Sequence, residues 1–80
     1  MEKEQILSEV NKIFRNELDN QDIVLNLNST AGDVEEWDSL SHIHLMVAIE
    51  KFFKVRFTTR EIQSLKNIDE LCNLIEAKQQ

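Results

Sequence analysis

The side chain with the clearest chemical potential is the hydroxyl of Ser39, which follows Asp38 at the start of a predicted helix. Unpaired backbone N–H groups and the helix dipole favour anions, phosphate among them, at a helix N-terminus. A phosphate ester on Ser39 would therefore lie in a favourable electrostatic setting. A serine in the first turn can also simply help to cap its helix. From these residues alone, both interpretations stay open.

Other reactive side chains near Ser39 do not predict catalysis or metal binding. Asp38, Ser39 and His42 fall within one helical turn, but no oxyanion hole is evident. A catalytic triad is defined by the geometry and roles of its residues, so we do not expect one here. His42 and His44 are two positions apart, so they point to different sides of a helix and are expected to contact solvent or a partner. The acid-rich residues 33–38 lack calcium-loop spacing. We expect no catalytic residue and no metal site.

Helices are predicted to position these side chains. The apolar periodicity and capping signals predict helices over residues 3–16, over residues 39–53, over a short stretch from Thr58 to about Leu65, and from Ile68 onward. Asp38 is the expected N-cap of the second helix. Thr58 with Glu61, and Asn67 with Glu70, have capping-box spacing.

The long connection over residues 19–37 is rich in Asn, Ser and Asp. Apolar residues alternate in this connection and again after the second predicted helix. They are expected to hold these loops against the core rather than to form a sheet: Ile23, Leu25, Leu27, Val55 and Phe57. The fold class is therefore predicted as an all-α four-helix bundle with a short third helix and a long first loop, forming a single domain over residues 1–80.

Composition and charge narrow the function classes. Eighty residues allow one small core, and a single cysteine allows no internal disulfide, so a reducing cytoplasm is expected. The net charge of −6 argues against nucleic acid as a partner. No apolar run is long enough for membrane insertion. Residues 1–40 carry ten acids against three bases, and residues 41–80 carry five against six, so a basic partner surface could be steered to the first half. A monomer is expected.

The predicted second helix has two apolar faces. At about 100° per residue, one face gathers the side chains expected in the core: Leu45, Met46, Ile49, Phe52 and Phe53. Leu40, Ile43 and Val47 gather on nearly the opposite side. They are candidates for an exposed patch of the kind that marks partner sites, unless the loop over residues 19–37 covers them.

The run Asp38-Ser39-Leu40 resembles the D-S-L motif of acyl carrier proteins and related thiolation domains. The resemblance extends to the helix that ends in Glu50-Lys51-Phe52-Phe53, which matches the family pattern E-x-x-F, and to the spacings of the two later helices. From Asp38 to Ile75 the pattern fits without a gap. The first helix and the long loop agree with the family in layout.

Membership of that family would give each of these residues a role. Ser39 would receive a covalent 4′-phosphopantetheine arm from coenzyme A, and Asp38 would cap the helix and help the phosphopantetheinyl transferase to engage the serine. Partner enzymes would dock on four residues of the second helix: Leu40, Ile43, Val47 and Glu50. The partners would be the transferase, an acyl- or aminoacyl-activating ligase, and a downstream transferase or synthase.

The sequence also departs from the fatty-acid-synthesis members of that family, which usually have a strongly acidic second helix and a glycine before the motif. Ser41, His42 and His44 occupy positions where acids or small polar residues are common. Trp37 before the motif resembles D-alanyl carriers and stand-alone carriers of specialised pathways. Trp37 is expected either to fix the loop against the second helix or to contact a partner or the arm.

The function expected from the resemblance is the shuttling of acyl or aminoacyl thioesters between separate enzymes, with no catalysis by the carrier itself. Cys72 is expected to be a small buried hydrophobe. An alternative from another class is an unmodified helical adaptor that docks partners through Leu40, Ile43 and Val47.

Overall fold

The capping residues decide where the helices begin. In the computed structural model, which describes residues 1–79, the helices are α1 (Lys3–Glu17), α2 (Ser39–Phe53), α3 (Thr59–Ser64) and α4 (Ile68–Lys78), with one turn of 3₁₀ helix, η1 (Ala31–Asp33), in the first connection. The all-α prediction with a short third helix and a long first loop is confirmed.

All three predicted caps form, and one of the two predicted capping boxes closes. The Asp38 carboxylate accepts a hydrogen bond from the backbone N–H of Ser41 at 2.9 Å. Thr58 and Glu61 form a reciprocal capping box at the start of α3. Asn67 accepts from the Glu70 N–H as predicted, but the Glu70 carboxylate accepts from the backbone N–H of Lys66 instead of closing the box.

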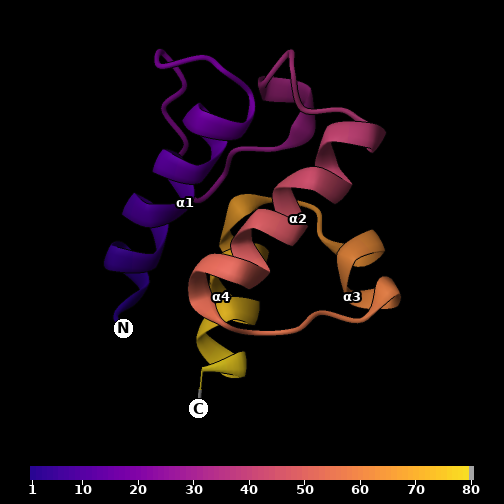
Figure 1. The fold of residues 1–80 in the computed structure, drawn as a ribbon. Coiled ribbons are helices and arrows are strands. Elements are labelled where there is room, and N and C mark those ends of the chain that lie inside the picture. The colour runs from indigo at the N-terminus through magenta and orange to yellow at the C-terminus, as the bar shows by residue number, and fades with distance from the viewer. Residues whose placement is uncertain (80) are drawn as a thin grey trace.

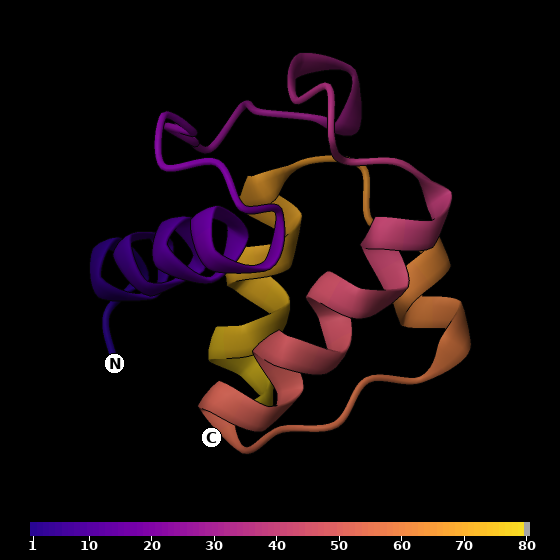
Figure 2. The same ribbon diagram turned by 45° about the horizontal axis from the view of Figure 1, so that its top comes forward.

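The helices do not form a regular parallel array. α2 lies between α1 and α3 in Figure 1, and the view in Figure 2 shows α4 between α1 and α2. α1 contacts both α2 and α4, whereas α3 stands at the side of the molecule and has no fully buried residue. A six-residue helix is marginal by itself, so α3 depends on contacts with its neighbours.

Hydrogen bonds to its backbone hold the long connection between α1 and α2 against the helices. The buried side chain of Asn11 on α1 accepts from the backbone N–H of Leu25 at 2.7 Å and donates to the Leu25 carbonyl at 3.3 Å. At the start of α4, the N–H of Ile68 donates to the carbonyl of Ser29. Ile23 and Leu25 are buried, which confirms that they pin this loop, and residues 1–79 contain no strand.

The core is built from all the long helices and from the pinned loop. Its fully buried large side chains come from α1, α2 and α4: Ile6, Val10, Phe14, Leu45, Met46, Ile49, Ile68, Leu71, Cys72 and Ile75. Cys72 is thus the small buried hydrophobe that was predicted.

The assignment of Phe52 to the core face is wrong. Its side chain is 49% exposed, whereas Phe53 is 7% exposed. Successive helical residues are about 100° apart, and Phe53 lies closer than Phe52 to the mean direction of the three buried residues Leu45, Met46 and Ile49. Phe52 is left at the margin of the core face, where its ring makes an edge contact with Phe53.

Candidate functional site

Ser39 is the first residue of α2 and is exposed. Within residues 1–79 its hydroxyl makes no hydrogen bond, whereas the hydroxyl of Ser41 accepts from the N–H of Asp38 at 2.8 Å and donates to the carbonyl of Glu36 at 2.8 Å. The capping interpretation of Ser39 is therefore wrong, because Asp38 and Ser41 cap this helix. The capping role of Ser41 was not predicted, because the usual capping-box signal has Glu or Gln at this position.

The Asp38 carboxylate fixes the backbone beside Ser39. The hydrogen bond from the Ser41 backbone N–H is the main reason that the pKa of Asp38 lies below its ordinary value of 3.8. Asp38 therefore stays ionised at neutral pH and satisfies N–H groups of the first turn. The predicted cap is confirmed, and the Ser39 hydroxyl takes no part in it.

Trp37, the residue that precedes the Asp-Ser pair, is anchored in the core. Its side chain is 7% exposed, and its ring meets the ring of Phe14 edge-on with centroids 5.0 Å apart. This burial supports the packing interpretation of Trp37 and leaves little of the ring for direct contact with a partner. Trp37 thus sets the position of the chain immediately before Ser39.

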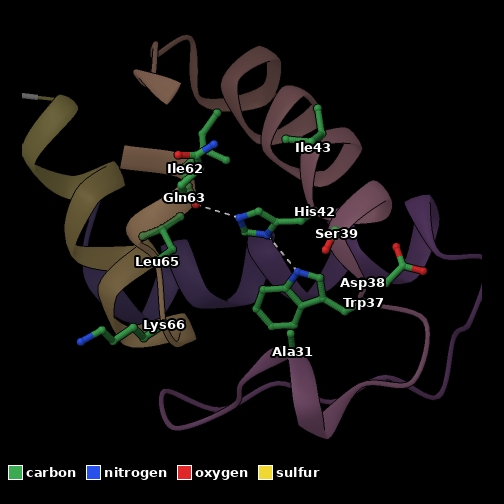
Figure 3. Close-up of a pocket in the computed structure, with 10 residues that line it drawn as sticks. All are labelled: Ala31, Trp37, Asp38, Ser39, His42, Ile43, Ile62, Gln63, Leu65 and Lys66. Carbon is green, nitrogen blue, oxygen red and sulfur yellow. Dashed lines mark hydrogen bonds between the residues drawn. The ribbon is translucent and has the colours of Figure 1, made fainter. Parts of the chain in front are cut away.

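His42 links Trp37 to α3. The indole N–H of Trp37 donates to Nδ1 of His42 at 3.0 Å, and Nε2 of His42 lies 2.9 Å from the carbonyl oxygen of Ile62 (Figure 3). Because the indole is only a donor and the carbonyl only an acceptor, these partners require a neutral imidazole with its proton on Nε2.

This bridge corrects one expectation and supports another. His42 was expected to contact solvent or a partner, but its ring is half-buried and serves as an internal tether. Both ring nitrogens have partners, so His42 is not free to act as a base for Ser39, which agrees with the expected absence of a triad. No local sequence signal announces a contact between residues twenty positions apart.

A pocket of about 570 Å³ opens beside Ser39 (Figure 3). Its walls come from the first connection, from the start of α2 and from α3, and include Ala31, Trp37, Ser39, His42, Ile62 and Leu65. Both residues of the Trp37–His42 bridge line this pocket. A group attached to Ser39 would leave the helix at the edge of this pocket.

The second apolar face of α2 is exposed. Leu40 is 72% exposed, Ile43 is 50% exposed and Val47 is 41% exposed, so the long loop does not cover them. They form a stripe that runs along the outside of α2, starting next to Ser39. A contiguous exposed apolar stripe of this kind is typical of a site for a protein partner.

Glu50, the acidic residue assigned to docking, is used inside the fold. Its Oε2 accepts from the backbone N–H of Phe57 at 2.8 Å, which fixes the connection between α2 and α3. Glu50 lies near the C-terminal end of α2, whereas Ser39 and Leu40 begin this helix.

The remaining candidate groups offer no second site. Burial raises the pKa of the Cys72 thiol to about 11, so it is protonated and unreactive at neutral pH. Within residues 1–79 no cluster of side chains has the composition of a metal site. No helix in the same part of the chain is long and apolar enough to cross a membrane.

Comparison with known proteins agrees with this geometry. Residues 5–75 match the family model described as a phosphopantetheine attachment site. Among solved structures, a holo acyl carrier protein from Geobacter metallireducens is 40% identical to this chain, superposes with a TM-score of 0.85, and is aligned over 91% of this chain and 84% of its own. A comparison with curated proteins returned no significant match.

The chain belongs to the acyl carrier protein family of phosphopantetheine-binding carriers. It is a carrier with a phosphopantetheine attachment site, and carriers of this family do not themselves catalyse reactions. The family implies a phosphopantetheinyl transferase and biosynthetic enzymes as partners.

Proposed function

We propose that Ser39 carries the phosphopantetheine arm and that the loaded protein shuttles acyl or aminoacyl thioesters between separate enzymes. The observation that carries this proposal is the exposed Ser39 hydroxyl, which is free of hydrogen bonds within residues 1–79 while Asp38 and Ser41 cap the helix. Ser39 also falls inside the residues that match the attachment-site family.

The chain's contribution to loading is one nucleophilic hydroxyl in a fixed position. The Ser39 oxygen forms the new bond to phosphorus, the phosphoanhydride bond of coenzyme A breaks, adenosine 3′,5′-bisphosphate leaves, and the serine proton passes to the transferase. The N-terminus of α2 suits the resulting phosphodiester anion. Once attached, the arm supplies the terminal thiol that holds the cargo.

The exposed stripe of Leu40, Ile43 and Val47 is the proposed docking surface. A carrier must leave each enzyme after delivery, and a small apolar patch with a charged rim suits weak, reversible association. Glu50 would contribute only through the carboxylate oxygen that the loop leaves free. Trp37 would act indirectly, by holding the segment before Ser39.

The oligomeric state, the location, the partner enzymes and the pathway are proposed in more detail than the family alone implies. We propose one carrier domain that works as a cytoplasmic monomer and receives its cargo from an acyl- or aminoacyl-activating ligase before passing it to a downstream transferase or synthase. Trp37 before the motif, and an α2 whose single acid is Glu50, support a specialised pathway over fatty-acid synthesis.

Intact mass after incubation with coenzyme A and a broad-specificity phosphopantetheinyl transferase tests the proposal. The wild-type protein should gain one phosphopantetheine unit. The variant Ile43→Glu should stay folded, but it should be loaded by the transferase, and accept cargo from its ligase, more slowly than the wild type. Folded wild-type protein that gains no mass beside a working control carrier would favour the unmodified adaptor.

A further inference from the structure

A shallow hollow of about 340 Å³ lies at the opposite end of α2 from Ser39, where the chain turns toward α3. Val47, the last member of the exposed stripe, lines it together with Val55. Three basic side chains also line this hollow: Lys51, Lys54 and Arg56. The docking stripe therefore runs directly into a basic depression with apolar walls.

The positive charge of this hollow exceeds its negative charge, because three bases share it with the single carboxylate of Glu50. Among residues 1–79, no carboxylate forms an ion pair with any of its three bases. Glu50 also lines the hollow, but one of its oxygens is bound to the Phe57 N–H. Glu61, the first acid along the chain after the hollow, pairs with Lys78 instead of with one of these bases.

The backbone at Lys54 is a second, independent observation. Lys54 ends α2 in the left-handed conformation, with φ of 58°. Glycine is the usual residue at such a helix end, because it adopts this conformation without steric cost. Stabilisation of the helix dipole does not explain this lysine, because Lys51 already places a cation in the last turn of α2.

We propose that this basic hollow is a docking subsite for a partner enzyme that presents an apolar side chain flanked by carboxylates. The inference rests on the proposed carrier function and specifies its partner. The partner's apolar residue would pack chiefly on the exposed side chain of Val47, and its carboxylates would meet Lys51, Lys54 and Arg56. Charge complementarity decides the occupant, because a basic partner segment would be repelled from this end of α2.

Two synthetic helical peptides test the chemistry of the occupant. Both carry the same leucine face, and one has glutamate and the other lysine at the flanking positions. Each is titrated into the ¹⁵N-labelled carrier at about 25 mM and about 300 mM salt, which changes the screening length severalfold. The glutamate peptide should shift the amides of Val47, Lys51, Val55 and Arg56, and the shifts should fade at high salt.

The same titration can overturn the proposal. The glutamate peptide should bind this end of α2 at least about tenfold more tightly than the lysine peptide at low salt, because charge complementarity sets the preference. Equal binding of the two peptides, or shifts confined to other surfaces, would show that the basic hollow is only a solvated surface.

The variant Lys54→Gly separates docking from stability. Glycine relieves the left-handed backbone, so the thermal midpoint should not fall, while affinity for the glutamate peptide should drop about threefold or more through the lost cation. Asp19→Gly is the matched control, since Asp19 also has a positive φ, of 51°, and lies at the end of α1. It should keep full affinity, and an equal loss in both variants would contradict the proposal.

Loading with phosphopantetheine distinguishes this inference from the proposed function. Lys51→Glu with Arg56→Glu should abolish binding of the glutamate peptide while Ser39 still accepts the arm. Unchanged peptide binding in a loaded variant would refute the subsite and leave the carrier function standing. A wild-type protein that binds the peptide but never accepts the arm would refute the carrier function alone.

Discussion

Ser39 and Ser41 are two residues apart on the first turn of α2, yet the fold uses only one of them. Ser41 hydrogen-bonds to the backbone of Asp38 and Glu36, and Ser39 makes no side-chain hydrogen bond within residues 1–79. A free hydroxyl on a rigid helix start can be modified without a cost in stability. This division of roles is the structural basis for assigning the arm to Ser39.

Alanine at each serine should separate the two roles. Ser41→Ala removes two hydrogen bonds and should destabilise the protein by about 1 kcal/mol, which lowers the thermal midpoint by about 4–8 °C in a domain of this size. Ser39→Ala should change stability by less than about 0.5 kcal/mol. Calorimetry measures both, and an equal loss at Ser39 would show that its hydroxyl is structural.

The buried thiol of Cys72 should react only slowly with thiol reagents in the folded protein. Its pKa of about 11 leaves almost no thiolate at pH 8, and its side chain is fully buried. A disulfide reagent should therefore label the native apo protein slowly and the urea-unfolded protein fast. The holo protein should gain one fast thiol, that of the arm. Rapid labelling of native apo protein would contradict the burial of Cys72.

At the scale of elements, α3 depends on tethers rather than on its own propensity. The His42 ring holds the Ile62 carbonyl from α2, and Lys78 on α4 pairs with Glu61. Ile62 and Leu65 pack against the core only in part. The pocket beside Ser39 keeps its shape because the tether through His42 joins its two walls.

Removing this tether should loosen α3 selectively. His42→Ala leaves the Trp37 indole and the Ile62 carbonyl without partners and should cost about 1–3 kcal/mol. Amide hydrogen exchange should accelerate most in α3. His44→Ala, two residues away on the exposed side of the same helix, is the control and should change little. Equal effects of the two histidine variants would show that the bridge has no role.

The orientation of α2 can be tested with its last two residues. Phe53→Ala should destabilise the protein by about 3–5 kcal/mol, because it empties part of the core. Phe52→Ala should cost less than about 1 kcal/mol, since nearly half of its side chain is in water. Denaturant unfolding provides both values. A larger loss at Phe52 than at Phe53 would mean that α2 is rotated from the position described.

The sequence predicts well those features that depend on neighbouring residues. Asp38, Thr58 and Asn67 announce helix starts because a cap acts on N–H groups two or three residues away. The exposed stripe of Leu40, Ile43 and Val47 follows from periodicity along one helix. Phe52 was misassigned because periodicity alone does not fix the edge of the face that its neighbours cover.

The features that the sequence leaves open depend on distant segments. Nothing near His42 signals that its ring will meet Ile62, and nothing near Glu50 signals that its carboxylate will bind the Phe57 N–H. Asn11 likewise pairs with the backbone of Leu25 across the first connection. Each is a polar group whose partner is set by how the helices pack.

At the scale of the whole molecule, charge is divided along α2. The acid-rich residues 33–38 lie at the end that carries Ser39, and Lys51, Lys54 and Arg56 lie at the other end. The exposed apolar stripe connects the two. For the proposed docking along this stripe, the polarity would give an enzyme one preferred direction along the helix, with its active site toward Ser39.

The account depends most directly on where the arm is attached. The decisive measurement is intact mass and peptide fragmentation after loading with coenzyme A and transferase, performed on the wild type, Ser39→Ala and Ser41→Ala. One phosphopantetheine unit should appear on the wild type and on Ser41→Ala, mapped to Ser39, and none should appear on Ser39→Ala. Loading of folded Ser39→Ala, or an arm mapped to another residue, would contradict the account.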